Sequence, residues 1–275
     1  MIITAGGDSF IFGSELADCR NDSFLHCTNA PSESSFTALL TQGYNYNCVA
    51  WPGYANDSIA RTVIEACESI NDQQVVIVSW TFPGRYEFRF NYDTRQLKSP
   101  WYAFNSWTIK DVASIEAELT HETEYNLLNF ISNKERADKT GVAEFAQTFY
   151  HHVGSSEYWE IYSTIKEIVY LQNYLKVKQI PYLFTCADNS IFVNHTIQEP
   201  DTVITSLYNQ IDHSNWFWFP PGTGANQTET PRGFYQWAVE NKYPMGTTHP
   251  LEQAHADAAE LMQGKFNELV TKHIL

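Results

Sequence analysis

The sequence predicts an α/β protein with a mostly parallel sheet that is covered by helices on both faces. Three observations support this fold class. Apolar strand-like runs alternate with helical patterns through the first 80 residues, and the connections between them are short. The third of these runs, residues 75–80, is apolar throughout, as expected for a parallel strand that is covered on both faces.

The first strand spans Ile2 to Ala5, which are apolar and partly β-branched, and Gly6-Gly7 predicts a tight turn after it. A helical pattern follows at residues 36–40. The second strand is expected at residues 46–51, where Pro52-Gly53 ends it.

The next helix has apolar residues at spacings of three and four between Ile59 and Ile70, and Asp57 or Ser58 can cap it. Asn71-Asp72 ends this helix. The third strand, residues 75–80, follows directly.

The second half of the chain predicts a long helix at residues 155–178, a strand at 180–187, a last strand at 216–219 and a closing helix at 250–270. Between the halves, residues 84–140 lose this rhythm and mix polar with aromatic side chains. We expect this segment to be an insertion beside the sheet, so that residues 1–275 form a single domain. The aromatic side chains of the insertion could stack on sugar rings or form a small hydrophobic cluster.

Charge and composition exclude several function classes. The net charge is −15 with only 17 Lys and Arg, which disfavours binding to nucleic acid or to an anionic membrane surface. Five cysteines without a CxxC motif indicate neither a disulfide framework nor a zinc ribbon. The start of the chain does not resemble a signal peptide, and no apolar run of 18 residues could span a membrane, so we expect a cytoplasmic protein. The oligomeric state is left open.

Residues that could take part in catalysis or binding lie where the predicted strands end. Gly7-Asp8-Ser9 follows the first strand, Pro52-Gly53 the second and Trp80-Thr81 the third, and the segment 246–250 (GTTHP) precedes the closing helix. Ligands of open parallel sheets bind beyond the carboxyl ends of the strands. A serine, glycine N–H groups and a late histidine are the parts that acyl transfer needs.

These segments resemble the blocks of the SGNH (GDSL) hydrolase superfamily. GGDSFIFGSEL (residues 6–16) resembles its first block, AWPGYANDSI (residues 50–59) its second, and HPLEQAH (residues 249–255) its last. The resemblance covers nearly the whole chain and implies a three-layer, flavodoxin-like fold and ester hydrolysis without a metal or organic cofactor. It also implies a nucleophilic role for Ser9, oxyanion N–H groups on Ser9 and Gly53, and a general base at His249.

The chain departs from the family pattern at two places. The third block of the family carries an asparagine that donates to the oxyanion, but residues 79–83 read SWTFP. The Thr81 hydroxyl, the Trp80 indole or the Asn56 amide could replace that donor. The last block carries an aspartate three residues before the histidine, where this chain has Gly246. A backbone carbonyl, Asp212 or Glu252 could orient His249 instead.

Other charged residues near the third strand are open to two interpretations. Arg85 could bind an acidic or sugar group of the substrate, with Trp80 beside it, or it could pair with Glu87 and fix the loop. His255 lies six residues after His249, a spacing that does not match HExxH, so we expect a helix-face histidine and no metal.

Together these features predict a serine ester hydrolase acting on a small-molecule or glycan ester. The polar, aromatic insertion favours an O-acetyl group on a carbohydrate. An acyltransferase on the same fold and an inactive binding module are the alternatives.

Overall fold

The computed structural model describes residues 1–19, 30–91, 100–110, 134–193, 201–222 and 231–274. Its strands are β1 (Ile2–Gly6), β2 (Asn45–Cys48), β3 (Gln74–Trp80), β4 (Tyr86–Arg89), β5 (Trp101–Phe104) and β6 (Tyr182–Cys186). Its α-helices are α1 (Ser9–Phe12), α2 (Phe36–Leu40), α3 (Asn56–Ser69), α6 (Val142–Phe149), α7 (Glu157–Val177), α8 (Ser190–Val193), α9 (Thr202–Tyr208), α10 (Phe234–Glu240) and α11 (Glu252–Ile274). Short helical turns are η1 (Ser106–Ile109), η2 (Tyr150–Gly154, a π-helix) and η3 (His213–Asn215).

The central sheet has four strands in the order β2-β1-β3-β6, and every pair in it is parallel. Strands β1, β3 and β6 consist almost wholly of buried residues, because helices cover both faces of the sheet, whereas the edge strand β2 has no buried residue. The predicted α/β class with a mostly parallel sheet is therefore confirmed. The order of these four strands is that of a flavodoxin-like sheet as far as it extends.

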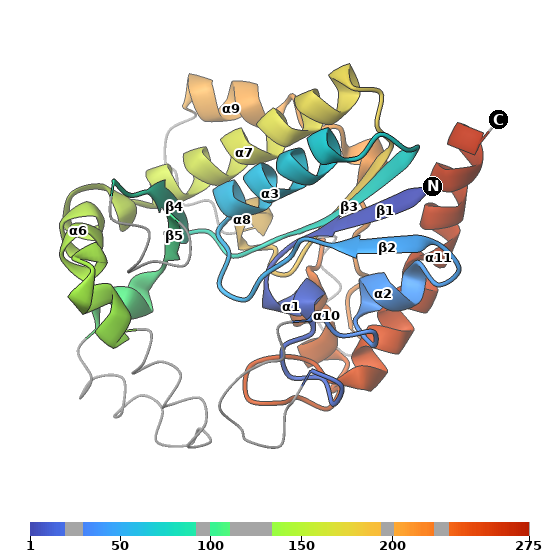
Figure 1. The fold of residues 1–275 in the computed structure, drawn as a ribbon, viewed down its shortest axis with the longest axis horizontal. Helices are drawn as coiled ribbons and strands as arrows, with labels where there is room; N and C mark the ends of the chain where they lie inside the picture. Colours follow the sequence, from blue (N-terminus) through green and yellow to red (C-terminus); the bar gives the residue numbers. More distant parts are fainter. Residues whose placement is uncertain (20–29, 92–99, 111–133, 194–200, 223–230, 275) are drawn as a thin grey trace.

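Two hydrophobic layers enclose the sheet (Figure 1). On one face, α3 and α7 pack on β3 and β6 through residues that include Ile59, Val63 and Ile165. On the other face, α1, α2, α10 and α11 pack on β1 and β3. The protein thus has three layers, helix–sheet–helix.

A third cluster of aromatic side chains lies beside the sheet, where β4, β5, α6 and η2 meet. Tyr86, Phe88, Phe104, Phe149 and Tyr150 contact one another there, with ring centroids 4.9–6.4 Å apart in pairs. Of the two roles considered for the aromatic residues of the insertion, these rings form the hydrophobic cluster. Residues 92–99 and 111–133 of the insertion lie outside the described ranges, and the prediction of a single domain over 1–275 stays a prediction.

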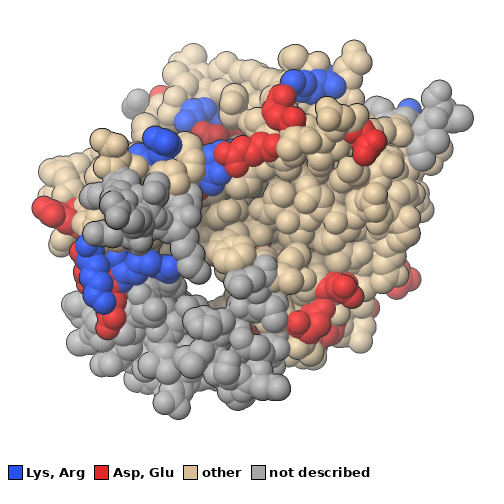
Figure 2. Space-filling view, in the orientation of Figure 1, with Lys and Arg blue, Asp and Glu red and all other residues tan. Residues whose placement is uncertain are grey.

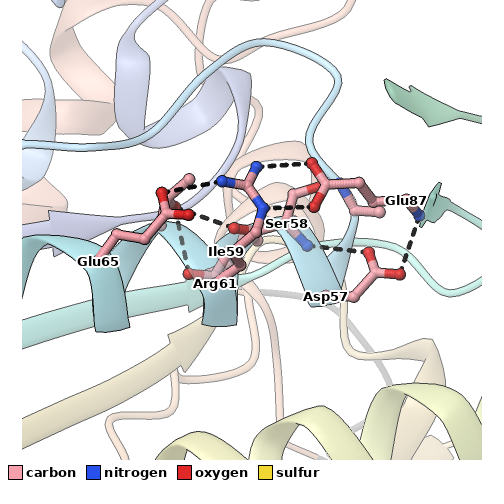
Figure 3. Close-up of polar contacts among 8 residues, drawn as sticks. Asp57, Ser58, Ile59, Arg61, Glu65 and Glu87 are labelled. Carbon is pink, nitrogen blue, oxygen red and sulfur yellow. Dashed lines mark hydrogen bonds and ion pairs between the residues drawn. The ribbon is translucent and has the colours of Figure 1, made fainter. Parts of the chain in front are cut away.

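An ion-pair cluster attaches β4 to α3 (Figure 3). The Arg61 guanidinium donates to both carboxylate oxygens of Glu87, each at 2.7 Å, and the Asp57 carboxylate accepts from the Glu87 backbone N–H at 2.9 Å. Arg61 also pairs with Glu65 at 3.0 Å. Opposite charges therefore lie side by side near α3 (Figure 2), although the net charge of the chain is strongly negative.

Three elements differ from the sequence prediction. The second strand, predicted over 46–51, is β2 (Asn45–Cys48) and ends before Pro52-Gly53. Helix α3 begins at Asn56, with Ala55 as its N-cap, and Ser58 accepts from the Ala55 N–H at 3.2 Å from inside the first turn, so neither Asp57 nor Ser58 is the cap. Residues 216–219 form isolated bridges, Phe184 with Trp216 and Phe219 with Arg232, and do not form a strand. This segment lies beside β6 through the Phe184–Trp216 bridge, and the rings of Trp216 and Trp218 stack on each other there.

No helix within the described ranges is both long enough and apolar enough to cross a membrane. The expected cytoplasmic location stays a prediction.

Candidate active site

The candidate site lies at the carboxyl ends of β1, β2 and β3. Strand β1 is central, and the chain passes to β2 on one side of it and to β3 on the other. This reversal is the topological switch point, where open α/β sheets bind ligands. Ser9 follows β1, Gly53 follows β2 and Arg85 follows β3.

Ser9 is the first residue of the short helix α1, and Asp8 is its N-cap. The Asp8 carboxylate accepts a hydrogen bond from the Phe10 backbone N–H at 3.0 Å. This bond holds the turn that presents the Ser9 hydroxyl beyond the strand end. Ser9 is 8% exposed, and within the described ranges its hydroxyl has one hydrogen-bond partner.

That partner is His249, which lies in the loop before α11 and is 240 residues away in sequence. The distance between His249 Nε2 and Ser9 Oγ is 2.7 Å. The ring of Phe10 packs against the imidazole with centroids 4.6 Å apart. The structure thus brings together the two residues that the sequence proposed as nucleophile and base.

Glu15 completes this arrangement, and the sequence analysis did not identify it. Glu15 Oε1 lies 2.7 Å from His249 Nδ1, on the side of the ring opposite to Ser9. The Thr248 hydroxyl lies 2.8 Å from the same nitrogen and donates to Glu15 Oε1 at 2.7 Å. The backbone N–H groups of Thr247 and Thr248 donate to the carboxylate as well, at 2.5 and 3.0 Å.

The surroundings keep Glu15 ionised. Burial alone would raise the pKa of this carboxyl, but the hydrogen bond and charge of His249, together with the hydrogen bonds from Thr248, lower it to about 2. An ionised carboxylate can only accept, so His249 Nδ1 carries the proton that faces Glu15. The Nε2 lone pair is then free to accept the proton of the Ser9 hydroxyl.

Gly246 explains why the family's aspartate has no place in this loop. A Cβ at residue 246 would lie 1.9 Å from Glu15 Oε2, so any larger residue there would displace the carboxylate from its present position. The Gly246 N–H donates to the His249 carbonyl at 2.8 Å and closes the turn.

The alternatives considered for orienting His249 do not serve that purpose. Asp212 pairs with Lys176 at 2.8 Å, and Glu252 accepts from the Ala17 backbone N–H at 2.7 Å. The described partners of His249 Nδ1 are side chains, Glu15 and Thr248, and not a backbone carbonyl.

A signal for Glu15 was present in the sequence. It follows Ser9 by six residues, within the same GGDSFIFGSEL segment, and is the first acidic residue after the serine. A serine and a carboxylate joined by one short helix must lie near the same strand end. With glycine at residue 246, Glu15 is the carboxylate nearest to Ser9 in sequence on its C-terminal side that could orient the histidine.

Gly53 lies on an exposed loop beside the Ser9 turn. The Trp51 backbone N–H donates to the Gly7 carbonyl at 3.4 Å, and the Trp51 ring meets that of Phe12 edge-on at 5.3 Å. Gly53 has φ +85°, a conformation that favours glycine. Among the described residues, no acceptor is hydrogen-bonded to the backbone N–H of Ser9 or of Gly53.

The three candidates for a further oxyanion donor are occupied or buried. The Asn56 amide donates to the Thr81 carbonyl and to Thr164, and the Thr81 hydroxyl donates to Asp8 at 2.5 Å. Trp80 is fully buried in the layer between the sheet and α3 and α7, with its ring edge-on to Phe184. Its predicted contact with substrate is wrong because the alternation of β3 turns this side chain into the core.

The charged residues after β3 pair differently from the expected Arg85–Glu87 contact. Arg85 Nη1 lies 3.1 Å from Asp8 Oδ2, whereas Glu87 pairs with Arg61. His255 is buried and accepts from the Phe36 N–H at 3.0 Å, and burial lowers its pKa to about 3. Within the described ranges, no three His, Cys, Asp or Glu side chains gather as metal ligands would.

Comparison with known proteins gives likenesses at the level of fold. No family model and no curated protein matches the chain. A member of the lipolytic protein G-D-S-L family from Veillonella parvula is similar at 10% identity and a TM-score of 0.42, covering 98% of this chain and all of that one. An extracellular lipase from Streptomyces rimosus is similar at 13% identity and a TM-score of 0.39, covering 98% of this chain and 99% of that one. Phospholipase A1 from Streptomyces albidoflavus is similar at 12% identity and a TM-score of 0.30, covering 99% of this chain and 76% of that one.

Proposed function

We propose that this protein is a serine ester hydrolase with a Ser9–His249–Glu15 triad. The observation that carries the proposal is the pair of 2.7 Å distances, from Ser9 Oγ to His249 Nε2 and from His249 Nδ1 to Glu15 Oε1. A nucleophile, a base and an oriented carboxylate in this order are the arrangement of serine hydrolases on unrelated folds.

Each residue has a defined part in the reaction. His249 Nε2 takes the Ser9 proton as Oγ bonds to the ester carbonyl carbon, and Glu15 stabilises the imidazolium that forms. The backbone N–H groups of Ser9 and Gly53 donate to the oxyanion. His249 then returns the proton to the leaving alcohol as its bond to the acyl carbon breaks. Water, deprotonated by His249, finally releases the acid and restores Ser9.

As substrate we propose an O-acetylated carbohydrate, in which the carbohydrate is the alcohol part of the ester and acetyl is the acyl part. The support is Trp51, an aromatic side chain that is 44% exposed and lies two residues before Gly53. The exposed part of this indole, whose ring also contacts Phe12, would stack on a sugar ring beside the site. Trp51→Ala should raise KM for an acetylated xylo-oligosaccharide several-fold. KM for ethyl acetate, which has no ring, should be unchanged. The matched control is Tyr44→Ala, another exposed aromatic residue, which lies at the opposite end of the sheet before β2.

A fluorophosphonate probe tests the activity itself. The probe should label Ser9, as mapped by mass spectrometry, and the label should disappear in Ser9→Ala, slow markedly in His249→Ala and persist in Ser14→Ala. Absence of labelling in the folded wild-type protein would contradict the proposal and favour the binding module. Transfer of the acyl group to an added alcohol in preference to water would identify the acyltransferase.

A further inference from the structure

Asp8 gathers hydrogen bonds from three parts of the chain at the nucleophile turn. Its Oδ1 accepts from the Phe10 N–H at 3.0 Å, and its Oδ2 accepts from the Thr81 hydroxyl at 2.5 Å and from Arg85 Nη1 at 3.1 Å. The Asp8 side chain is fully buried, whereas that of Arg85 is 20% exposed. A buried carboxylate needs both hydrogen bonds and an opposite charge, and Arg85 supplies the charge.

We infer that Arg85 is a positioning residue for the nucleophile, acting through Asp8. This inference rests on the proposed function. Asp8 precedes Ser9 directly and caps a helix of only four residues, so a displacement of its carboxylate moves the Ser9 backbone N–H and hydroxyl with it. Arg85 therefore holds both the attacking oxygen and one oxyanion donor in place.

Arg85 is itself held in a defined position. Its guanidinium lies over the Phe82 ring, 5.0 Å from the centroid. The hydroxyl of Tyr150 donates to the Gly84 carbonyl at 2.6 Å, which fixes the backbone beside Arg85 from the η2 side. Such support restricts the guanidinium to the orientation that reaches Asp8.

Aromatic contacts also connect the Arg85 side chain with His249, the proposed general base. The Phe82 ring lies 6.1 Å from that of Phe10, and Phe10 lies 4.6 Å from His249. Arg85 is thus linked indirectly to both partners of the Ser9–His249 hydrogen bond: to Ser9 through the neighbouring residue Asp8, and to His249 through the Phe82 and Phe10 rings. Loss of the Arg85 side chain should therefore disturb the alignment of Ser9 and His249 more than it lowers the stability of the protein.

The ion pair between Arg85 and Asp8 argues against the alternative that Arg85 binds an anionic substrate. The positive charge of Arg85 is compensated by a buried negative charge 3.1 Å away, and the pair as a whole is neutral. An incoming carboxylate would compete with Asp8, whose burial leaves it no other cation among its described contacts.

The test is Arg85→Ala, with Arg61→Ala as the matched control. Arg61 also forms an ion pair with a buried carboxylate, Glu87 (Figure 3), but it lies on α3, and none of its described hydrogen bonds is to Asp8, Ser9 or His249. Misplacement of reacting groups by about 1 Å costs about 10²-fold in rate. We therefore expect Arg85→Ala to lower kcat and the rate of fluorophosphonate labelling by about 10²-fold, with KM nearly unchanged for both 4-nitrophenyl acetate and the anionic 4-nitrophenyl succinate. Added guanidinium ion at millimolar concentration should restore part of the lost rate, as should Arg85→Lys.

Other results would overturn the inference. A rise in KM confined to 4-nitrophenyl succinate would show that Arg85 binds substrate. An equal loss of kcat in Arg61→Ala would show a general effect of losing an ion pair, and an unchanged kcat in Arg85→Ala would show that Asp8 holds the turn without it. A wild-type protein that takes no label would instead overturn the proposed function, so the two failures are distinguishable.

Discussion

Replacement of Glu15 by glutamine isolates the contribution of one charge to the proposed triad. The substitution keeps the shape of the side chain, but every described partner of the carboxylate is a donor: His249 Nδ1, the Thr248 hydroxyl, and the N–H groups of Thr247 and Thr248. The glutamine amide must therefore turn one N–H toward a donor. If it faces His249, the imidazole takes the other tautomer and its Nε2 can no longer accept the Ser9 proton.

The structure sets the size of the effect. A pKa of about 2 against the ordinary 4.5 means that the site stabilises the charged carboxyl over the neutral one by about 3 kcal/mol more than water does, through His249 and Thr248 together. If most of this interaction is lost for the developing imidazolium, kcat falls about 10²-fold. A histidine held in the wrong tautomer costs about 10⁴-fold in a serine protease. We therefore expect Glu15→Gln to lower kcat for 4-nitrophenyl acetate between these limits, with little change in KM.

The control is Glu252→Gln. Glu252 is a neighbouring glutamate whose described hydrogen bond is to the Ala17 backbone N–H and not to His249. The Glu252→Gln substitution should leave kcat within about two-fold of the wild-type value. Circular dichroism and thermal unfolding would check that both variants are folded. A folded Glu15→Gln protein with kcat within three-fold of wild type would refute the assignment of Glu15 as the third member of the triad.

Two further predictions concern the loop over Glu15 and the cluster at α3. Gly246→Ala places a Cβ 1.9 Å from Glu15 Oε2 and should lower kcat at least ten-fold by displacing the carboxylate, which steady-state kinetics on a folded variant would detect. Burial, with the charges of Glu87 and Glu167, raises the pKa of Asp57 to about 7. Because the folded pKa is above the unfolded value, the associated stability is present below about pH 4 and is lost as pH rises through 7. Thermal unfolding between pH 5 and 9 should show this loss in the wild type and not in Asp57→Asn; parallel curves for the two proteins would contradict it.

Much of the architecture follows from local sequence patterns. Apolar β-branched runs such as residues 75–80 predict strands that are buried on both faces, and their alternation with helices predicts a parallel sheet. The ends of those strands then predict where a site must lie. Ser9 and His249 lie in short segments near such ends, and their roles as nucleophile and base were proposed because these segments resemble the first and last blocks of the SGNH superfamily.

The pairing of side chains was decided only by the tertiary structure. Glu15 becomes the partner of His249 because the loop from Gly246 to His249, more than 230 residues later, folds across it. Arg85 pairs with Asp8, and not with the nearby Glu87, because β1 and β3 are neighbours in the sheet. Local periodicity determines which face of a strand or helix is buried, whereas the contacts of a charged side chain depend on distances that long-range packing sets.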